Sequence, residues 1–368
     1  MARRVLALLA SLGLLLVVSA PTTAANINSQ NRFVVTNLQS DVPGRAAHTD
    51  PDLVNGWGIA ALPTSPWWVA DNGTHKSTLY NGNTGAKVAL TVDVAGAGGE
   101  PADPTGIVAN TSSEFVITGS SGATSAARFI FDGEDGAISG WNGGPSSVVE
   151  ATSQNGAIYK GLAIGSVTSG GTTHNFLYAT DFHNNHVDVY DGSFDLQTWA
   201  GAFVDPGLPA GFAPFGIQNI AGTIYVTYAK QDADAEDEIA GPGLGFVSAF
   251  GTDGSFLGRV ASGGALNAPW GLAWAPASWE RFGGHLLVGN FGDGRINGYS
   301  PTASGWEARG HLKDANSHPI AIDGLWGIGF GNNNGSNNGG AGPTNTLFFA
   351  AGPDDESHGL FGSVSMAP

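Results

Sequence analysis

Three stretches of the sequence place histidine close to carboxylates, each directly after an apolar run. They are Asp71 to His75, Asp181 to His186 and Pro353 to His358. The chain has nine histidines, and four of them fall in these three loops. Imidazole and carboxylate groups that arrive from separate loops can converge on zinc or on a transition metal. The sequence therefore predicts a metal site formed by His75, His183 and His358.

Within the second of these loops, Asp181 and His183 are candidate catalytic residues, because a carboxylate beside an imidazole can hold and transfer a proton. His186 is a weaker candidate: if a strand begins between it and His183, the two side chains face opposite sides. The alternative interpretation is that the loops are turns, in which Asp and Asn side chains bond nearby backbone N–H groups. No contiguous ligand motif such as HExxH is present.

An acidic run from Asp232 to Glu238 offers a further set of oxygen ligands. Such a loop can bind calcium as a structural ion, but the spacing lacks the glycine and the terminal glutamate of an EF-hand. The alternative is a solvated charged loop without any ion.

A second set of candidates precedes a glycine that recurs six times before isoleucine or leucine. The six residues are Trp57, Thr105, Lys160, Phe215, Trp270 and Trp326. The four aromatic members are predicted to bind substrate as a stacking platform for a sugar ring, an aromatic ring or a cation; packing in the interior is the alternative. Lys160 is either a snorkelling surface group or a binding and proton-transfer group, and it is a catalytic candidate in the second case.

The same six glycines define the elements that must position these residues. They are spaced by 48, 55, 55, 55 and 56 residues, and a repeat of about 50 residues made of short strands is typical of one propeller blade. We predict an all-β, six-bladed β-propeller with four-stranded blades that start near residues 57, 105, 160, 215, 270 and 326. In this geometry the residues before the glycines and the ends of the second strands share one mouth of the central channel.

Runs rich in β-branched and aromatic residues mark the second strands of the repeats. They are predicted at residues 67–70, 114–118, 176–180, 223–228, 285–289 and 347–350. Arg32 to Leu38 reads as a strand without a repeat of its own, and the sixth repeat ends after only three strands. Pairing the first strand with the last blade would close the ring and hide the exposed edges. Residues 26–368 are therefore predicted to form one domain.

The first 25 residues have the composition of a secretory signal peptide. Arg3 and Arg4 precede an apolar run from Val5 to Val18, and small residues lead to a predicted cut after Ala25. No later run is long enough to span a bilayer, so we expect a secreted monomer without membrane insertion. With 14 basic against 31 acidic residues and a formal net charge of −17, nucleic acid is an unfavourable partner. No cysteine is present, and no nucleotide-binding motif is found, so no nucleotide cofactor is expected.

Many long segments in a fixed order also resemble a family of uncharacterised secreted bacterial proteins. Among them are WWVADNGTHKSTLY, LYATDFHNNHVDVYD, LNAPWGLAWAP, LLVGNFGDGRINGY and LFFAAGPDDESHGLFG. The resemblance covers roughly Arg32 to Val364 and implies a six-bladed propeller, related in plan to the NHL-repeat and senescence-marker lactonase groups. The lactonase-like propellers place Asn, Asp or Glu on inner strands to bind a divalent cation. This chain has mostly aromatic residues at comparable positions.

Two classes of function follow from these residues. The first is an extracellular, metal-assisted enzyme that acts on a small or polymer-derived sugar or aromatic substrate, with zinc, copper or iron as the metal. Hydrolase, lyase and oxidoreductase activities are all compatible with it. The second is a non-catalytic propeller that binds an extracellular ligand or protein, since the fold serves many functions. A structural protein of the cell surface is a third possibility.

Overall fold

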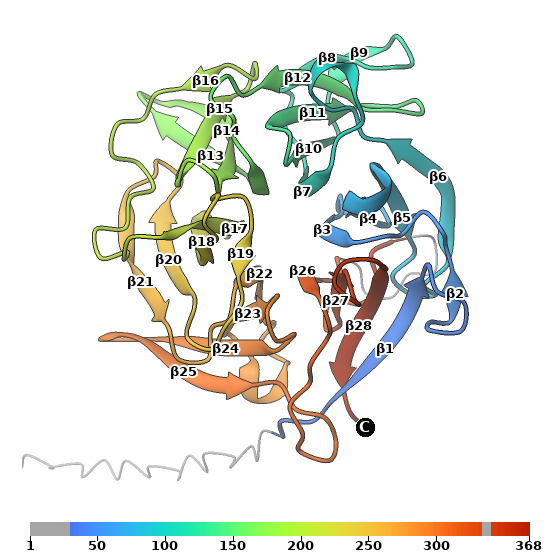
Figure 1. Ribbon diagram of the computed structural model, residues 1–368, viewed down its shortest axis with the longest axis vertical. Coiled ribbons are helices and arrows are strands. Elements are labelled where there is room, and N and C mark those ends of the chain that lie inside the picture. The colour runs from blue at the N-terminus through green and yellow to red at the C-terminus, as the bar shows by residue number, and fades with distance from the viewer. Residues whose placement is uncertain (1–29, 333–339) are drawn as a thin grey trace, which may run out of the picture.

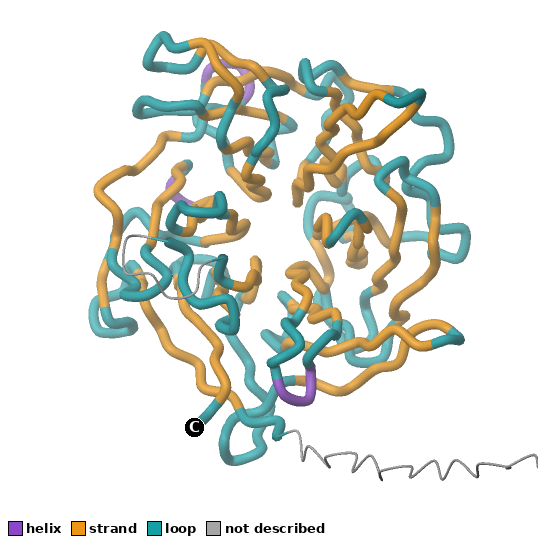
Figure 2. Tube along the Cα trace, turned by 180° about the vertical axis from the view of Figure 1, so that it is seen from behind, coloured by secondary structure: helices purple, strands orange, loops and turns teal. Residues whose placement is uncertain are grey.

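Six mainly antiparallel sheets surround one central axis in the computed structural model (Figures 1 and 2), which describes residues 30–332 and 340–368. The inner strands are β3 (Gly56–Ala60), β7 (Pro104–Ala109), β13 (Tyr159–Ser169), β17 (Phe212–Ile220), β22 (Pro269–Trp274) and β26 (Leu325–Phe330). Each inner strand contacts the next one, and β26 contacts β3. The predicted six-bladed propeller is therefore confirmed. The predicted signal peptide, residues 1–25, lies outside the described residues.

The blades are numbered from 1 to 6 in the order of these inner strands, and each has three further strands. Blade 1 has β4 (Trp67–Asp71), β5 (Lys76–Tyr80) and β6 (Lys87–Asp93). Blade 2 has β10 (Phe129–Gly133), β11 (Ala137–Trp141) and β12 (Val148–Thr152). Blade 3 has β14 (Thr172–Asp181), β15 (His186–Asp191) and β16 (Leu196–Gln197). In blades 4 and 5 they are β18 (Thr223–Gln231), β20 (Phe246–Gly251) and β21 (Phe256–Ser262); and β23 (Leu286–Asn290), β24 (Ile296–Thr302) and β25 (Gly305–His311).

Blade 6 closes the ring with strands from both ends of the sequence. It joins β27 (Leu347–Ala351) and β28 (Leu360–Met366) to β1 (Phe33–Ser40), which pairs antiparallel with β28 from Phe33 opposite Met366 to Ser40 opposite Leu360. A short strand, β2 (His48–Thr49), adds to β1 in parallel. The predicted closing strand is thus confirmed, two residues longer at its C-terminal end than the sequence indicated.

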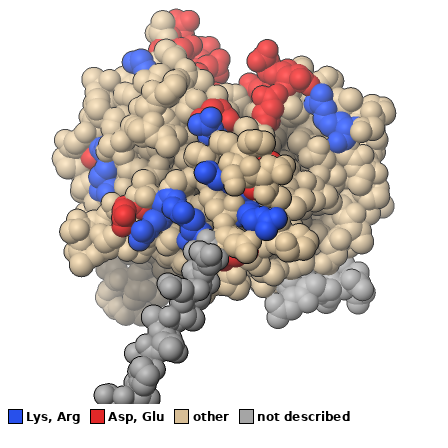
Figure 3. Space-filling view, turned by 90° about the horizontal axis from the view of Figure 1, so that it is seen from below, with Lys and Arg blue, Asp and Glu red and all other residues tan. Residues whose placement is uncertain are grey.

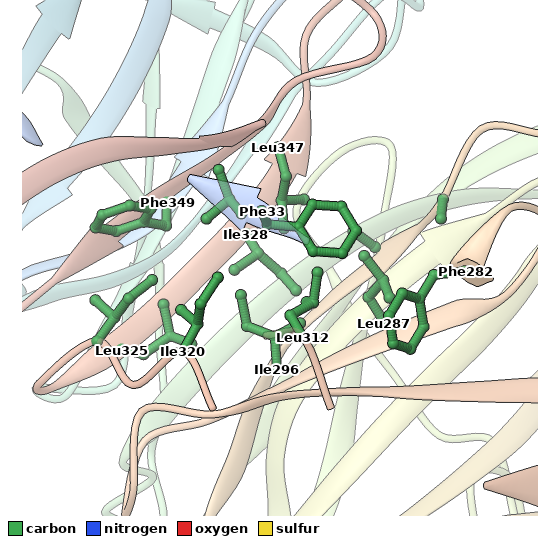
Figure 4. Close-up of a cluster of buried hydrophobic side chains, with 14 of the residues drawn as sticks. Phe33, Phe282, Leu287, Ile296, Leu312, Ile320, Leu325, Ile328, Leu347 and Phe349 are labelled. Carbon is green, nitrogen blue, oxygen red and sulfur yellow. The ribbon is translucent and has the colours of Figure 1, made fainter. Parts of the chain in front are cut away.

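The closing strand is fixed by its side chains as well as by its backbone. Phe33 is buried between blades 5 and 6 among Leu287, Leu312 and Leu347 (Figure 4). Its ring centroid lies 4.6 Å from that of Trp279. Burial of a phenylalanine contributes about 2–3 kcal/mol through the hydrophobic effect, so this contact couples the N-terminal strand to both neighbouring blades.

The repeated glycines permit the inner strands to approach closely. A Cβ atom added to Gly58 would lie 2.6 Å from the carbonyl oxygen of Thr105 in the next blade, and one added to Gly327 would lie 2.6 Å from that of Trp57. Real Cβ atoms do not approach backbone atoms so closely, so only glycine fits this position around the axis.

Blade 2 differs from the sequence-based prediction. Residues 114–118 were expected as its second strand, but Val116–Thr118 (β8) pairs with Thr124–Ala126 (β9) in a separate hairpin inserted after β7. The second strand is β10 instead. The insertion looks like a blade strand because Phe115 and Ile117 are buried in the core between blades 2 and 3. As a consequence, Glu134 and its neighbours follow the second strand of blade 2 at the channel mouth, in place of residues 119–121.

The only helical segments in the described part of the chain are three single-turn 3-10 helices: η1 (Asn72–Thr74), η2 (Ala97–Gly99) and η3 (Glu280–Phe282). None of the described residues forms a helix of the length and hydropathy required to cross a bilayer. One further strand, β19 (Glu238–Ile239), folds back on the end of β18. It brings the acidic run of blade 4 to the channel mouth.

Candidate functional site

The residues that precede the repeated glycines meet at the mouth where the inner strands begin. All six side chains are buried, none with more than 9% of its residue surface exposed. The rings of Trp57 and Trp326 stack with centroids 3.5 Å apart, and Trp270 meets both edge-on. Phe291 also stacks on Trp326, with centroids 4.2 Å apart, and Phe215 meets Trp326 edge-on. The four aromatic residues predicted to bind substrate therefore fill the axis and pack against one another, as in the alternative interpretation.

Lys160 is the cationic member of this ring, with only 1% of its side chain exposed. Its Nζ lies 2.5 Å from Oε1 of Glu134, 3.2 Å from Oδ1 of Asp237 and 5.4 Å from the centre of the Trp57 ring. Burial lowers the pKa of Lys160, but the charge and hydrogen bond of Glu134 outweigh this effect, so its pKa lies above the usual value. Lys160 is therefore a buried ammonium ion held over an aromatic face.

Two further glutamates complete what we call the axial cluster: Lys160, Glu134, Asp237, Glu238 and Glu356. Burial raises the pKa of Glu238 to about 8, although the nearby charge of Lys160 opposes this. Burial also raises the pKa of Glu356, partly offset by a hydrogen bond from Asn55. At neutral pH Glu238 is therefore mostly protonated, next to the ion pair between Lys160 and Glu134.

Asparagine side chains connect this cluster to the aromatic residues below it. Asn72 donates to Oε2 of Glu134 at 2.9 Å, and Asn55 donates to Asn72 and to Oε1 of Glu356, both at 3.2 Å. Asn55 in turn accepts a hydrogen bond from Nε1 of Trp326 at 3.2 Å. Asn72 and Asn55 thus orient Glu134 and Glu356, respectively, through these hydrogen bonds.

The loop that presents Glu356 has an unusual backbone. Asp354, Asp355 and Glu356 have φ values of 58°, 52° and 63°, three consecutive non-glycine residues in the left-handed region. Each costs of the order of 1 kcal/mol relative to a relaxed conformation. Strain of this kind is concentrated at functional sites, and here it places a carboxyl group beside the channel mouth.

The three histidines predicted to share a metal are held apart by separate partners. Nδ1 of His75 lies 2.8 Å from Oδ1 of Asp103, and Nδ1 of His358 lies 2.7 Å from Oδ2 of Asp41. Nδ1 of His183 faces the carbonyl oxygen of Ala235 at 3.2 Å. Among the described residues, the one group whose atoms are close enough to share an ion does not contain these three.

That group is Asp181, His186 and Asp188. Asp181 is fully buried at the end of β14, and the other two lie on one side of β15, at its first and third residues. Hydrogen bonding to Asp188, opposed by burial, raises the pKa of His186 to about 9. The sequence analysis ranked His186 below His183, although the strand alternation His-x-Asp could have shown that His186 and Asp188 face the same way.

The acidic run from Asp232 to Glu238 does not gather its oxygens around one point. The backbone N–H of Glu236 donates to Oδ1 of Asp232 at 3.0 Å, which closes the loop on itself. Oδ1 of Asp237 instead accepts a hydrogen bond from Lys160, and the charge of Lys160 also acts on Glu238. The run contributes no member to the metal-compatible group found among the described residues.

A cavity of about 620 Å³ lies at the opposite end of the axis, where the inner strands end. Aliphatic side chains such as Ile59, Ile107 and Ile328 line it, together with the polar groups of Gln218 and Asn219. The protein thus has a polar mouth above the aromatic residues and a cavity with both aliphatic and polar walls at the other end.

Charge is unevenly distributed over the surface. Acidic side chains gather in two groups at one edge of the view in Figure 3, whereas Lys and Arg are scattered over the rest of that face.

Comparison with known proteins places the chain among relatives from a virus. No protein-family model matches it. Two uncharacterised proteins of Acanthamoeba polyphaga mimivirus are similar over most of their length. One is 34% identical over 340 residues, which cover 87% of this chain and 82% of the viral protein, and the other is 30% identical over 341 residues, which cover 90% and 79%. The resemblance to secreted bacterial proteins stays a prediction.

Solved structures share the architecture. A protein of unknown function from Bacteroides thetaiotaomicron superposes with a TM-score of 0.53 at 10% identity, over 90% of this chain and 76% of that one. Virginiamycin B lyase from Staphylococcus aureus gives a TM-score of 0.48 at 14% identity, over 91% and 100%. At these identities the likeness concerns the fold alone.

Proposed function

This chain belongs to the family of the two uncharacterised mimivirus proteins, and we propose that it is a secreted enzyme whose axial cluster performs acid–base chemistry. The observation that carries the proposal is the contrast within the cluster: burial raises the pKa of Glu238 to about 8, while Glu134 forms an ion pair with the buried Lys160. Two carboxyl groups whose environments separate their protonation states are the usual acid and base of a catalytic site.

The residues take distinct roles in this proposal. Glu238 donates its proton to an oxygen of the substrate, and Glu356 or Glu134 accepts a proton on the other side of the reacting bond. Lys160 stabilises the negative charge that develops, because a fixed cation in a site with little water is already oriented before the reaction begins. A hydrolase or a lyase acting on a small or polymer-derived substrate, with a sugar or an aromatic ring, fits these roles.

The chemistry proposed here belongs to the carboxylates rather than to a metal bound by His75, His183 and His358, since those side chains have separate partners. His183 and Asp181, the other two catalytic candidates, lie in blade 3 beside the cluster. The contact of His183 with Ala235 holds the loop that carries Asp237 and Glu238.

The test is turnover of a panel of lactones, p-nitrophenyl esters and p-nitrophenyl glycosides by the purified chain and its variants. Glu238→Gln and Lys160→Met are expected to lower kcat/KM by about 100-fold or more. Asp355→Asn is the matched control, since it changes an exposed acidic residue of the neighbouring loop and asparagine tolerates the left-handed backbone. Equal activity of the Glu238 variant and the control on a turned-over substrate would refute the assignment.

Ligand binding without turnover is a second candidate function, and the cavity at the opposite end of the axis favours it. Its volume suits a small molecule, and its walls offer aliphatic side chains together with the polar groups of Gln218 and Asn219. Gln218 is exposed at the cavity wall, so Gln218→Trp should fill the space without disturbing the core. Loss of 1-anilinonaphthalene-8-sulfonate fluorescence in this variant, with full binding in Glu238→Gln, would support a binding function at this end.

A further inference from the structure

Asp181, His186 and Asp188 form a compact group in blade 3, where β14 and β15 lie side by side (Figure 1). Nε2 of His186 lies 2.9 Å from Oδ1 of Asp188 and 3.5 Å from Oδ2 of Asp181. The three donor atoms come from the end of one strand and the start of the next, so the backbone pairing of Asp181 with His186 fixes their separation.

The surroundings of the His186 ring require a positive charge. Nε2 faces two carboxylate oxygens, and Nδ1 faces the carbonyl oxygen of Asn184 at 3.3 Å. Every one of these neighbours is a hydrogen-bond acceptor, but a neutral imidazole has only one N–H to donate. If Nδ1 donates to the carbonyl, the lone pair of Nε2 points toward the carboxylates. Either a second proton on the ring or a metal ion between Nε2 and the carboxylates supplies the positive charge.

Hydrogen bonds from neighbouring residues also orient the carboxylates of Asp181 and Asp188. The Tyr159 hydroxyl donates to Oδ2 of Asp188 at 2.6 Å, which leaves Oδ1 for a ligand bond. The backbone N–H of Asn184 donates to Oδ1 of Asp181 at 3.0 Å, and its side chain donates to Oδ2 at 2.8 Å. Orientation of ligand carboxylates and imidazoles by outer hydrogen bonds of this kind is characteristic of metal sites.

The group is accessible to solvent on the side of His186. The Asp181 side chain is fully buried and that of Asp188 is 11% exposed, but 42% of the His186 side chain is accessible. A metal ion can therefore enter over the imidazole, and a water molecule can occupy a fourth position there.

We propose that Asp181, His186 and Asp188 bind one zinc ion, with water as the fourth ligand. One imidazole and two carboxylates are ligands that zinc accepts in a tetrahedral arrangement. The site is distinct from the axial cluster, and its existence does not depend on the enzymatic proposal above.

Zinc at this position would stabilise the loop between β14 and β15. That loop contacts blade 4, because the side-chain amide of Gln231 donates to the carbonyl oxygen of Phe182 at 2.6 Å and His183 contacts Ala235. The ion would thus link the strand ends of blade 3 to the segment that carries Asp237 and Glu238.

The test is isothermal titration of the EDTA-treated chain with zinc chloride. One ion per chain is expected, together with a rise in Tm. His186→Asn and Asp188→Asn should each weaken zinc binding by about 100-fold, while His183→Asn, a histidine in the same loop but outside the group, should bind as the wild type does. Cobalt(II) in place of zinc should give visible absorption bands of a tetrahedral site in the wild type and in His183→Asn only.

The melting curves of the metal-free variants separate a lost ligand from a lost fold. If metal-free His186→Asn has a lower Tm than the wild type, Asp188→Asn is the decisive variant, because asparagine keeps the shape of the aspartate side chain. Wild-type protein that binds no zinc at micromolar concentration, or a His186 variant with unchanged affinity, would show that the group is an ion pair without a metal.

Discussion

The proposed activity depends on the protonation state of Glu238. Its carboxyl group must be protonated to act as an acid, and burial raises its pKa to about 8. The acid form is therefore present below this pH and is lost as the pH rises through it. We predict that kcat/KM falls above about pH 8, measured from about pH 6 to about pH 10. A profile that stays flat across this range would assign the proton transfer to another group.

Glu134 and Asp237 both contact Lys160, yet their removal should have different costs. The Glu134 side chain is 27% exposed and that of Asp237 is 76% exposed, while Lys160 is buried. Glu134→Gln should lower the free energy of unfolding by about 3 kcal/mol, because it removes the better-shielded partner of a buried cation. Asp237→Asn should lower it by less than about 1 kcal/mol, since an exposed pair is screened by water. Urea denaturation of both variants measures the difference, and equal costs would contradict it.

The inner strands depend on the absence of a side chain at the repeated glycine. Gly58→Ala would bring its methyl group against the backbone of the next blade, and we expect a loss of about 2 kcal/mol in the free energy of unfolding. Gly207→Ala is the control, because a Cβ there would have no neighbour closer than 3.6 Å. That variant should change stability by less than about 0.5 kcal/mol. Thermal unfolding followed by circular dichroism compares the two.

The second blade shows where reasoning about strands from sequence fails. Residues 114–118 have the composition of a strand, and Val116–Thr118 is one, but it forms a hairpin outside the blade. The local sequence pattern indicates that a segment is extended and half-buried, but tertiary packing determines which strand it pairs with. The correct second strand, β10, places Glu134 at the channel mouth, and for this reason the main partner of Lys160 was missing from the sequence-based site.

The ring as a whole relies on the pairing of β1 with β28. Phe33→Ala should lower the free energy of unfolding by about 3–5 kcal/mol, because it leaves a cavity between blades 5 and 6. The exposed valine Val34, next to it on the outward side of β1, provides the control: Val34→Ala should cost less than about 1 kcal/mol. Guanidinium denaturation monitored by tryptophan fluorescence measures both. Similar costs would mean that closure depends on backbone pairing alone.

The sequence by itself determined the number of blades, their starting points and the closing strand, because a repeated glycine and short apolar runs report a structure that recurs locally. It also identified Lys160 as an exception within the ring. Only the tertiary structure decided which groups meet it. Glu134, Glu238 and Glu356 come from the segments that follow the second strands of blades 2, 4 and 6. His75, His183 and His358 contact separate partners. The direction of a loop at the mouth depends on contacts between blades, and these contacts leave no regular pattern along the chain.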